Sequence, residues 1–365
     1  MSRVVGAIFV AGFTVGLASN ASATIVLRDN VQALITAGAP PDSPGARVDQ
    51  NTPASEFSGV VSINIRYPNG QGGTSSYICS GTLVGKRQVV TAGHCVDTNG
   101  QGQIIDVSQP FAVSGNEVVV IFNAEPNVGD PGRAAVNASN VTMHADYKGF
   151  GVCPAGVGGG SQCLNDDVAV ITLSQDAPAS AKIYKTYMGD VGEGQLITMV
   201  GYGLSGDGIN GYTINPDFRI KRSGQNRMDL FDLDDEQNFA AGKKEVWYAD
   251  FDGNGYDSFC TWGLACTAAL ANDKESSIGG GDSGGSTFIY AYGEYMLVGN
   301  NTFGSNYRAG KFGSYFGGML MSGYDDYLLA ATDGHIAFVP EPATGALMLG
   351  GLGMMGLMAR RRKIK

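Results

Sequence analysis

The chain has 365 residues, with 24 Lys and Arg against 34 Asp and Glu, which gives a formal net charge of −10 at pH 7. An acidic chain repels phosphate backbones, so this charge disfavours a nucleic-acid-binding function. The 55 glycines, and short runs of Val, Ile, Thr, Tyr and Phe separated by turn residues, predict a mostly β protein without long amphipathic helices.

The N-terminal region has the pattern of an export signal. Arg3 precedes an apolar run from Val4 to Leu17, and Ala21-Ser22-Ala23 is a small-x-small cleavage site. Residues 1–23 are therefore predicted to be a signal peptide that signal peptidase removes. Residues 24–47 are rich in proline and polar residues, which predicts a propeptide that forms no core; a flexible linker is the alternative. Six cysteines, an even number, fit the oxidising compartment that export implies.

Three segments in the body of the chain carry the residue types of a nucleophilic hydrolase. They are Thr91-Ala92-Gly93-His94-Cys95, Asp166-Asp167 before the apolar run Val168 to Leu173, and Gly279 to Gly285, which reads GGGDSGG. A serine hydroxyl is a poor nucleophile unless a histidine accepts its proton, and that histidine needs a carboxylate to hold its tautomer. Of the three histidines, only His94 has flanks that suit a general base.

In this order the segments resemble the His, Asp and Ser motifs of the trypsin/chymotrypsin family of serine endopeptidases. The resemblance covers roughly residues 48–333 and continues through Cys79 to Val84, Val200 to Gly203, Thr302 to Gly304, and Gly313 to Tyr315. It implies an all-β fold of two six-stranded antiparallel β-barrels with the active site between them, and a short C-terminal helix from Tyr324 to Ala331.

The resemblance also implies roles for individual residues. Ser283 is the expected nucleophile, His94 the general base, and Asp167 the orienting carboxylate, with Asp166 as the alternative. The backbone N–H groups of Gly281 and Ser283 are expected to form the oxyanion hole. No metal or organic cofactor is required for this chemistry.

The six cysteines fall into three locally close pairs, Cys79 with Cys95, Cys153 with Cys163, and Cys260 with Cys266. Proximity favours these disulfides, although sequence alone leaves the connectivity open. The resemblance independently implies the first pair, beside His94. A zinc site is disfavoured because no Cys-x-x-Cys or neighbouring histidine accompanies the other pairs.

Members of the family are often made as zymogens, cut after a basic residue so that a new apolar N-terminus pairs with the acid before the serine. Here the cut would follow Arg47, and the Val48 amine would pair with Asp282 and order the loop that carries Ser283. Asp49-Gln50 stands where two glycines are common. An unregulated flexible linker is the alternative.

The substrate-binding residues that the resemblance implies are Ser277, Thr302, Phe303, Gly304 and Gly313. Ser277, six residues before Ser283, would form the base of the specificity pocket, and an uncharged base favours large apolar or aromatic side chains over Lys or Arg. The chain lacks the cysteine that commonly precedes the serine motif. In a shifted register, Asp273 or Glu275 would enter the pocket and select basic residues.

A candidate metal site lies in the run Asp250-Phe251-Asp252-Gly253-Asn254-Gly255-Tyr256-Asp257. Oxygen ligands at alternate positions with a glycine nearby match the first half of an EF-hand loop, so Asp250, Asp252, Asn254 and Asp257 are candidate ligands for a structural calcium ion. Thr261 stands where a bidentate glutamate should be. An acidic surface turn is the alternative interpretation.

The C-terminal region combines Val339-Pro340-Glu341-Pro342-Ala343, an apolar stretch over 343–359, and the basic run Arg360 to Lys363. It resembles a bacterial PEP-CTERM sorting signal, which implies cleavage near the Pro-Glu-Pro by an exosortase-like enzyme. The apolar stretch is expected to be a transmembrane helix that gives transient membrane association, with its charges on the cytoplasmic side. An ordinary tail anchor is the alternative. Residues 334–365 are thus assigned to a linker and sorting segment.

Residues 48–333 are therefore predicted to be a trypsin-like protease domain that cleaves proteins and peptides through an acyl-enzyme, in the periplasm, at the surface or outside a Gram-negative-type bacterium. Cutting after Arg47 and before Pro340 leaves 16 basic and 31 acidic residues, a net charge of −15, so nucleic acid is not an expected partner. The alternative is a non-catalytic, protease-like protein that binds at the cell surface or matrix. An esterase is disfavoured because Ser283 does not lie in a strand-to-helix elbow.

Overall fold

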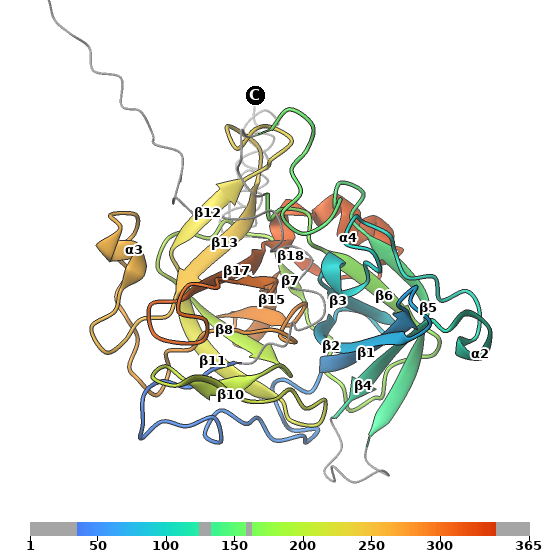
Figure 1. The fold of residues 1–365 in the computed structure, drawn as a ribbon, viewed down its shortest axis with the longest axis horizontal. Helices are drawn as coiled ribbons and strands as arrows, with labels where there is room; N and C mark the ends of the chain where they lie inside the picture. Colours follow the sequence, from blue (N-terminus) through green and yellow to red (C-terminus); the bar gives the residue numbers. More distant parts are fainter. Residues whose placement is uncertain (1–34, 124–132, 158–162, 341–365) are drawn as a thin grey trace, which may run out of the picture.

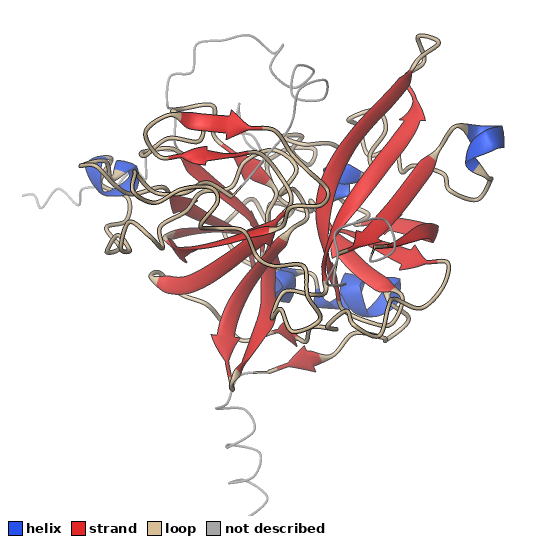
Figure 2. Cartoon of the chain, turned by 90° about the horizontal axis from the view of Figure 1, so that it is seen from below, coloured by secondary structure: helices blue, strands red, loops and turns tan. Residues whose placement is uncertain are grey.

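The computed structural model describes residues 35–123, 133–157 and 163–340 (Figure 1). Strands dominate the described residues and the helices are few and short (Figure 2), which confirms the predicted all-β class. Two halves lie side by side, the first built from strands β1 to β6 and the second from the later strands (Figure 1).

The first half is a closed barrel with strand order β1-β2-β3-β6-β5-β4. Its strands are β1 (Val60–Pro68), β2 (Thr74–Leu83), β3 (Gln88–Thr91), β4 (Glu117–Phe122), β5 (Ala134–Met143) and β6 (Ala169–Leu173). Alternate residues Val61, Ile63 and Ile65 of β1 belong to one buried cluster inside this half. Because successive side chains of a strand face opposite sides, this alternation fills the barrel interior from one face of β1.

The second half consists of three sheets among the described residues. The six-stranded sheet has the order β11 (Arg222–Met228), β8 (Gln195–Gly201), β14 (Ser286–Ala291), β15 (Glu294–Asn300), β7 (Thr186–Tyr187) and β18 (Phe338–Val339). The four-stranded sheet has the order β12 (Leu230–Leu233), β13 (Lys244–Asp250), β17 (Tyr315–Met319) and β16 (Phe303–Gly304), and β10 (Gly211–Ile214) pairs with β9 (Ser205–Asp207).

This second half differs in detail from the expected closed antiparallel barrel. Strand β7 pairs in parallel with β15 and β18, and the β14–β15 register shifts between Thr287 and Phe288. Such a bulge bends a strand and interrupts its ladder. At Gly318 an added Cβ would lie 1.7 Å from the Asn300 carbonyl oxygen, so backbones approach where a side chain would not fit.

The two halves are joined by a shared apolar core. Val90 and Val170 of the barrel belong to the same buried cluster as Val200, Phe288 and other residues of the second half. A separate cluster in the second half includes Ile35, which is fully buried. The shared core fixes the two halves against each other, so that residues at the ends of their strands can form one site.

Five short helical segments complete the described fold: η1 (Gly93–Cys95), α2 (Phe111–Ser114), α3 (Ser258–Thr261), η2 (Met321–Gly323) and α4 (Asp325–Ala331). Helix α4 is the expected C-terminal helix. No helix in the described ranges is long and apolar enough to cross a membrane, which overturns the expected transmembrane helix. The stretch 343–359, on which that expectation rested, lies outside the described residues, as does the predicted signal peptide.

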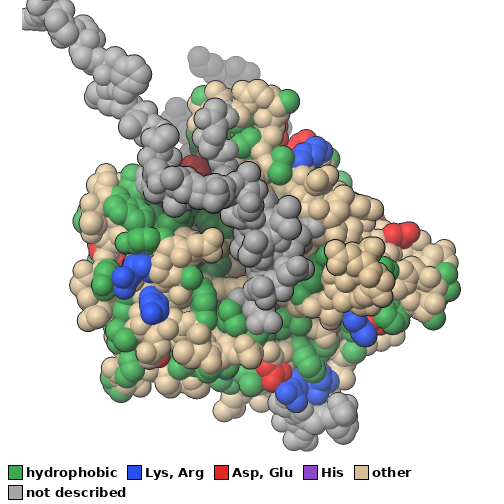
Figure 3. Space-filling view, viewed as in Figure 1, with side chains coloured by type: hydrophobic (Ala, Val, Ile, Leu, Met, Phe, Trp, Pro, Cys, Tyr) green, Lys and Arg blue, Asp and Glu red, His purple; other side chains and the backbone are tan. Residues whose placement is uncertain are grey.

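The structure contains all three expected disulfides, Cys79–Cys95, Cys153–Cys163 and Cys260–Cys266. The first joins β2 to η1 and so ties the segment that carries His94 to the barrel. On the face seen in Figure 3, the described basic and acidic side chains lie in small separate groups.

Candidate active site

His94 and Asp167 meet because their strands are neighbours. Strands β3 and β6 pair with Thr91 opposite Ala169, so η1, which follows β3, lies beside the residues that precede β6. Asp167 is fully buried; its Oδ2 lies 2.6 Å from His94 Nδ1, and its Oδ1 accepts a 2.7 Å hydrogen bond from the His94 backbone N–H. This two-point contact fixes the imidazole and leaves Nε2 as the ring nitrogen not bonded to the acid.

Asp166, the alternative acid, points to a different histidine. Its φ of 65° places it in the left-handed region, and its Oδ1 lies 3.1 Å from His144 Nδ1. Burial opposes protonation of His144, but the hydrogen bond to Asp166 and that carboxylate's charge outweigh it, so the pKa of His144 is raised. The structure therefore separates the two adjacent aspartates and assigns each to its own histidine.

Ser283 lies against the barrel that carries His94. Its carbonyl oxygen accepts a 2.8 Å hydrogen bond from the Ser80 N–H, and it lies 3.6 Å from the Cys95 sulfur, which is 4.0 Å from His94 Nε2. Gly284 adopts a φ of +75°, and a Cβ there would lie 2.0 Å from Thr91 Oγ1. Glycine is thus required for the serine loop to approach β3 this closely.

The predicted oxyanion-hole residues are held by the same loop. Gly281 has a φ of +102°, and its carbonyl oxygen accepts a 2.7 Å hydrogen bond from the Ser80 hydroxyl. Among the described residues, the backbone N–H groups of Gly281 and Ser283 donate to no backbone or side-chain acceptor. Both donors are therefore available to an oxyanion.

Asp282 is a fully buried carboxyl that forms no ion pair with the described residues. Burial raises its pKa to about 7, although hydrogen bonds from the Gly203 and Gly279 N–H groups and the charge of Arg222 lower it. A buried acid in this state is destabilised as an anion unless a cation reaches it.

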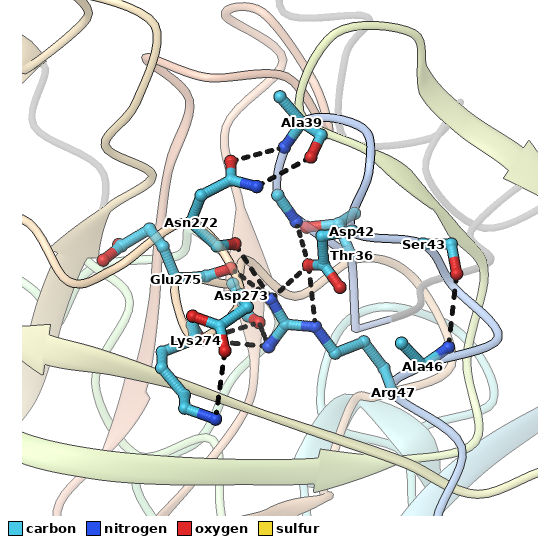
Figure 4. A network of polar contacts seen from close by, with 12 residues as sticks. Thr36, Ala39, Asp42, Ser43, Ala46, Arg47, Asn272, Asp273, Lys274 and Glu275 are labelled. Carbon is cyan, nitrogen blue, oxygen red and sulfur yellow. Dashed lines mark hydrogen bonds and ion pairs between the residues drawn. The ribbon is translucent and has the colours of Figure 1, made fainter.

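Arg47, after which cleavage is expected, is buried rather than exposed in a loop (Figure 4). Its guanidinium pairs with Asp42 and donates to the carbonyl oxygens of Asn272, Lys274 and Glu275. Residues 35–47 thus contribute to the folded domain, against the expectation of a segment that forms no core. The prediction failed because the carbonyl oxygens that bind Arg47 lie more than two hundred residues away in sequence.

Val48 is fixed in the intact chain by its neighbours. The Asp49 carboxylate lies 2.9 Å from the ammonium of Lys221, which is fully buried. The Val48 N–H points to Gly45 O at 3.4 Å, and no contact joins Val48 to Asp282 among the described residues. Asp49, which stands where the family commonly has glycine, therefore holds this segment in place through its ion pair with Lys221.

The predicted substrate-binding residues lie on segments that surround the serine loop. Ser277 is buried, its N–H donates to Thr36 Oγ1, and its hydroxyl donates to Ile278 O at 3.1 Å. Gly313 has a φ of +85°, and Arg308 lies 3.1 Å from the position of an added Cβ. Phe303 pairs through β16 with β17, and neighbouring Gly304 is exposed; Thr302 is buried.

Asp273 and Glu275, the two acids that would enter the pocket in a shifted register, contact other groups instead. The Asp273 side chain is 67% exposed and lies beside Lys274. Glu275 is buried, and its Oε2 accepts a 2.8 Å hydrogen bond from the Leu270 N–H. These contacts favour Ser277 over either acid as the pocket residue.

Two further groups support the site and were missed in the sequence. Asn300 is fully buried and its Nδ2 donates to the carbonyl oxygens of Thr91 and Asp167, so it links the second half to the catalytic side of the barrel. Phe150 packs edge-on against His94, with ring centroids 5.7 Å apart. No local motif marks either residue; the position of Asn300, two residues before the Thr302 segment, is the one available signal.

The candidate metal residues come together only in part. One oxygen each of Asp250, Asp252 and Asp257 lies within 4.8 Å of the others, whereas Asn254 is exposed in the turn between them. Thr261 Oγ1 donates to the Asp257 carbonyl oxygen and so serves helix α3 instead.

Comparisons with known proteins agree with this geometry. Residues 49–217 match the family model described as Trypsin, a range that includes His94 and Asp167 and ends before Ser283. Brachyurin from Leptuca pugilator is 26% identical over 137 residues, which are 37% of this chain and 49% of that protein. The alignment thus spans about half the length of this curated relative.

A second family model, the PEP-CTERM protein-sorting motif, matches residues 338–363. This motif indicates an exported bacterial protein with exosortase-type sorting, as predicted. The chain therefore contains a trypsin-family domain and carries a PEP-CTERM sorting motif.

Proposed function

We propose that this protein is a secreted serine endopeptidase that hydrolyses peptide bonds through an acyl-enzyme formed on Ser283. The observation that carries the proposal is the buried Asp167 carboxylate, which binds both the ring and the backbone of His94. A histidine held in this way serves as a general base better than one held only by packing. The trypsin-family match over 49–217 supports the same reaction class.

In this mechanism Ser283 attacks the substrate carbonyl carbon while His94 Nε2 accepts the hydroxyl proton and later delivers it to the leaving amine. Asp167 keeps the proton of His94 on Nδ1 and stabilises the imidazolium cation. The N–H groups of Gly281 and Ser283 bind the developing oxyanion. Among the described residues the Ser283 hydroxyl has no hydrogen-bond partner in the intact chain, so the final alignment of Ser283 with His94 belongs to the activated or substrate-bound enzyme.

Activation is proposed to involve cleavage before Ile35 rather than after Arg47. Ile35 is fully buried and its carbonyl oxygen accepts a 3.0 Å hydrogen bond from Ser205 Oγ. Gly203, two residues before Ser205, donates to Asp282 Oδ1 at 3.1 Å. An ammonium created on Ile35 would therefore arise close to the buried Asp282, without disturbing the contacts of Arg47 and Asp49.

N-terminal sequencing of the active enzyme tests this proposal. A mature start at Ile35, with normal activation of Arg47→Gln, is expected. A start at Val48, with no activation of Arg47→Gln, would restore the original expectation.

The specificity pocket expected at Ser277 is proposed to prefer large apolar or aromatic P1 side chains. Peptide substrates that differ only at P1 test this preference. Higher kcat/KM for Phe than for Lys is expected, and Ser277→Asp should favour Lys because a buried carboxylate needs a cation. A preference of the unmodified enzyme for Lys would point back to the acids at 273 and 275.

The reaction itself is tested by labelling with a fluorophosphonate probe. The exported chain should be labelled, Ser283→Ala should not, and His94→Gln should label far more slowly because serine and histidine act as a unit. His144→Gln is the matched control, since His144 also pairs with an aspartate of the same barrel. No labelling of the unmodified protein, before or after N-terminal processing, would favour the non-catalytic binding protein.

A further inference from the structure

The loop between β13 and α3 gathers carboxylates with no cation to balance them. Asp250 and Asp252 are buried, and with the half-buried Asp257 they bring one oxygen each within 4.8 Å of one another. None of these three side chains takes part in an ion pair with a described residue. Packing three like charges this closely is unfavourable without a positive partner.

Two buried oxygen atoms at this cluster have no hydrogen-bond partner. Oδ1 of Asp252 and Oε1 of Glu275 are inaccessible to solvent and unpaired, in side chains whose residues are only 6% and 2% exposed. Such atoms are rare in folded proteins because each loses its hydration without compensation. Asp252 belongs to the three-carboxylate group itself, so its unpaired oxygen marks a position for a ligand.

The backbone of the loop holds the carboxylates in place without occupying all of their oxygens. Oδ2 of Asp250 accepts hydrogen bonds from the N–H groups of Ser258 and Phe259, and Oδ1 of Asp257 accepts one from Cys260. Each of these two carboxylates therefore uses one oxygen for the start of α3. The second oxygen of Asp257 is left for a bound ion, whereas the Asp250 carboxyl also contacts the carboxyl of Asp229.

Glu275 is a further buried acid whose charge acts on Asp252. It lies outside the group of three carboxylates whose oxygens come together. A calcium site needs six to eight oxygen ligands, so water would complete the coordination that the three carboxylates begin.

We propose that Asp250, Asp252 and Asp257, with Glu275 beside them, bind a structural calcium ion. A hard cation matches the all-oxygen donor set, and calcium tolerates the irregular geometry better than magnesium does. The exposed turn residue Asn254 is not part of the proposed site.

The proposed ion is positioned to order the segment that leads to the catalytic serine. Glu275 immediately precedes Ser276 and Ser277, and its carbonyl oxygen accepts a hydrogen bond from the buried Arg47. A bound ion would thereby stabilise the expected specificity pocket. This functional consequence rests on the proposed protease activity, whereas ion binding itself does not.

The decisive experiment uses the exported chain with Ser283→Ala, so that ion binding is measured without proteolysis. Calcium chloride is added after EDTA treatment, and the thermal midpoint is followed by circular dichroism. At a calcium concentration about 100-fold above Kd, a rise of about 5–10 °C is expected. Terbium luminescence sensitised by nearby aromatic rings such as Tyr256 gives a direct measure of binding. No rise and no luminescence would overturn the proposal.

Asp252→Asn, in the same Ser283→Ala background, locates the ion. It should weaken calcium binding at least about 100-fold while leaving the EDTA-treated protein no less stable, because it removes charge repulsion. Asp235→Asn is the matched control, since buried Asp235 lies in a second acidic cluster with Asp166 and Glu236. Calcium stabilisation that survives Asp252→Asn and disappears in Asp235→Asn would overturn the assignment to this loop.

Discussion

The barrel contains two histidine–aspartate pairs whose acids are adjacent in sequence, and they differ in what surrounds them. His94 and Asp167 lie at the serine loop, where Asp167 makes two hydrogen bonds and is fully buried. His144 and Asp166 lie under α4, where the His144 ring packs edge-on against Tyr324 and Tyr327. A His–Asp pair therefore forms part of the candidate active site in one place, and packs against helix α4 in the other.

This difference shows that the acid's environment, and not the presence of a His–Asp pair, distinguishes the active-site candidate. The Asp166 backbone N–H donates to the Tyr324 hydroxyl, whereas the Asp167 carbonyl oxygen accepts from Asn300. Asp166 has a left-handed φ of 65°, and the two adjacent side chains contact different histidines. Five variants separate the two pairs experimentally.

Exchanging the two acids for amides should give the largest contrast. Asp167→Asn should lower kcat by about 10⁴-fold, because the amide holds the wrong tautomer of His94. Asp166→Asn should change kcat by less than about tenfold, because the Asp166 carboxylate contacts His144 and not His94. Steady-state kinetics on a peptide substrate measure both, and a comparable loss in the two variants would contradict the assignment of Asp167.

Removing the support of the first pair should affect both activity and stability. Asn300→Ala leaves the carbonyl oxygens of Thr91 and Asp167 and the Met319 N–H without a buried partner. A loss of about 2–4 kcal/mol in the free energy of unfolding is expected, together with a lower kcat. Urea unfolding of the Ser283→Ala background gives the stability, and unchanged kcat would show that Asn300 does not position Asp167.

Removing the support of the second pair should affect stability alone. Tyr324→Phe leaves the buried Asp166 N–H unpaired, at a cost of about 1–3 kcal/mol. Activity at a temperature well below the unfolding midpoint should be retained. A large loss of kcat in this variant would mean that the two pairs are coupled through the chain between Asp166 and Asp167.

The smallest effect should be a change in the pH dependence of stability. The raised pKa of His144 means that its contribution is complete below the unfolded-state value of about 6.5 and is lost as pH rises through the higher folded-state value. Asp166, Asp146 and Glu245 face the ring and favour its cation. The stability of the parent protein relative to His144→Gln should therefore fall as pH rises from 6 toward 8, and an increase would contradict the raised pKa.

The sequence predicted well those features that depend on local pattern. The acid directly before an apolar run pointed to Asp167, whose carboxylate lies against the His94 ring. Each of the three disulfides joins cysteines at most 16 residues apart. Local spacing predicted the disulfides because the paired cysteines lie close together along the chain.

Features that depend on distant partners were not predictable in the same way. Ile35, Thr36 and Arg47 lie in a polar, proline-containing segment. Thr36 nevertheless bonds to Ser277, and Arg47 to Glu275, far along the chain. The second half contains a six-stranded and a four-stranded sheet, and its β14–β15 bulge and close backbone approaches depend on packing that no local pattern reports. Glu275, whose charge acts on Asp252 in the β13–α3 loop, likewise lies outside the sequence motif of that loop.

The position of β18 brings the folded domain directly up to the sorting motif. Phe338 and Val339 pair with β7, and the Pro-Glu-Pro begins at the next residue, Pro340. There is thus almost no free chain between this sheet and the Pro-Glu-Pro. An exosortase-like enzyme that acts at the Pro-Glu-Pro would have to work directly beside an edge strand of the folded domain.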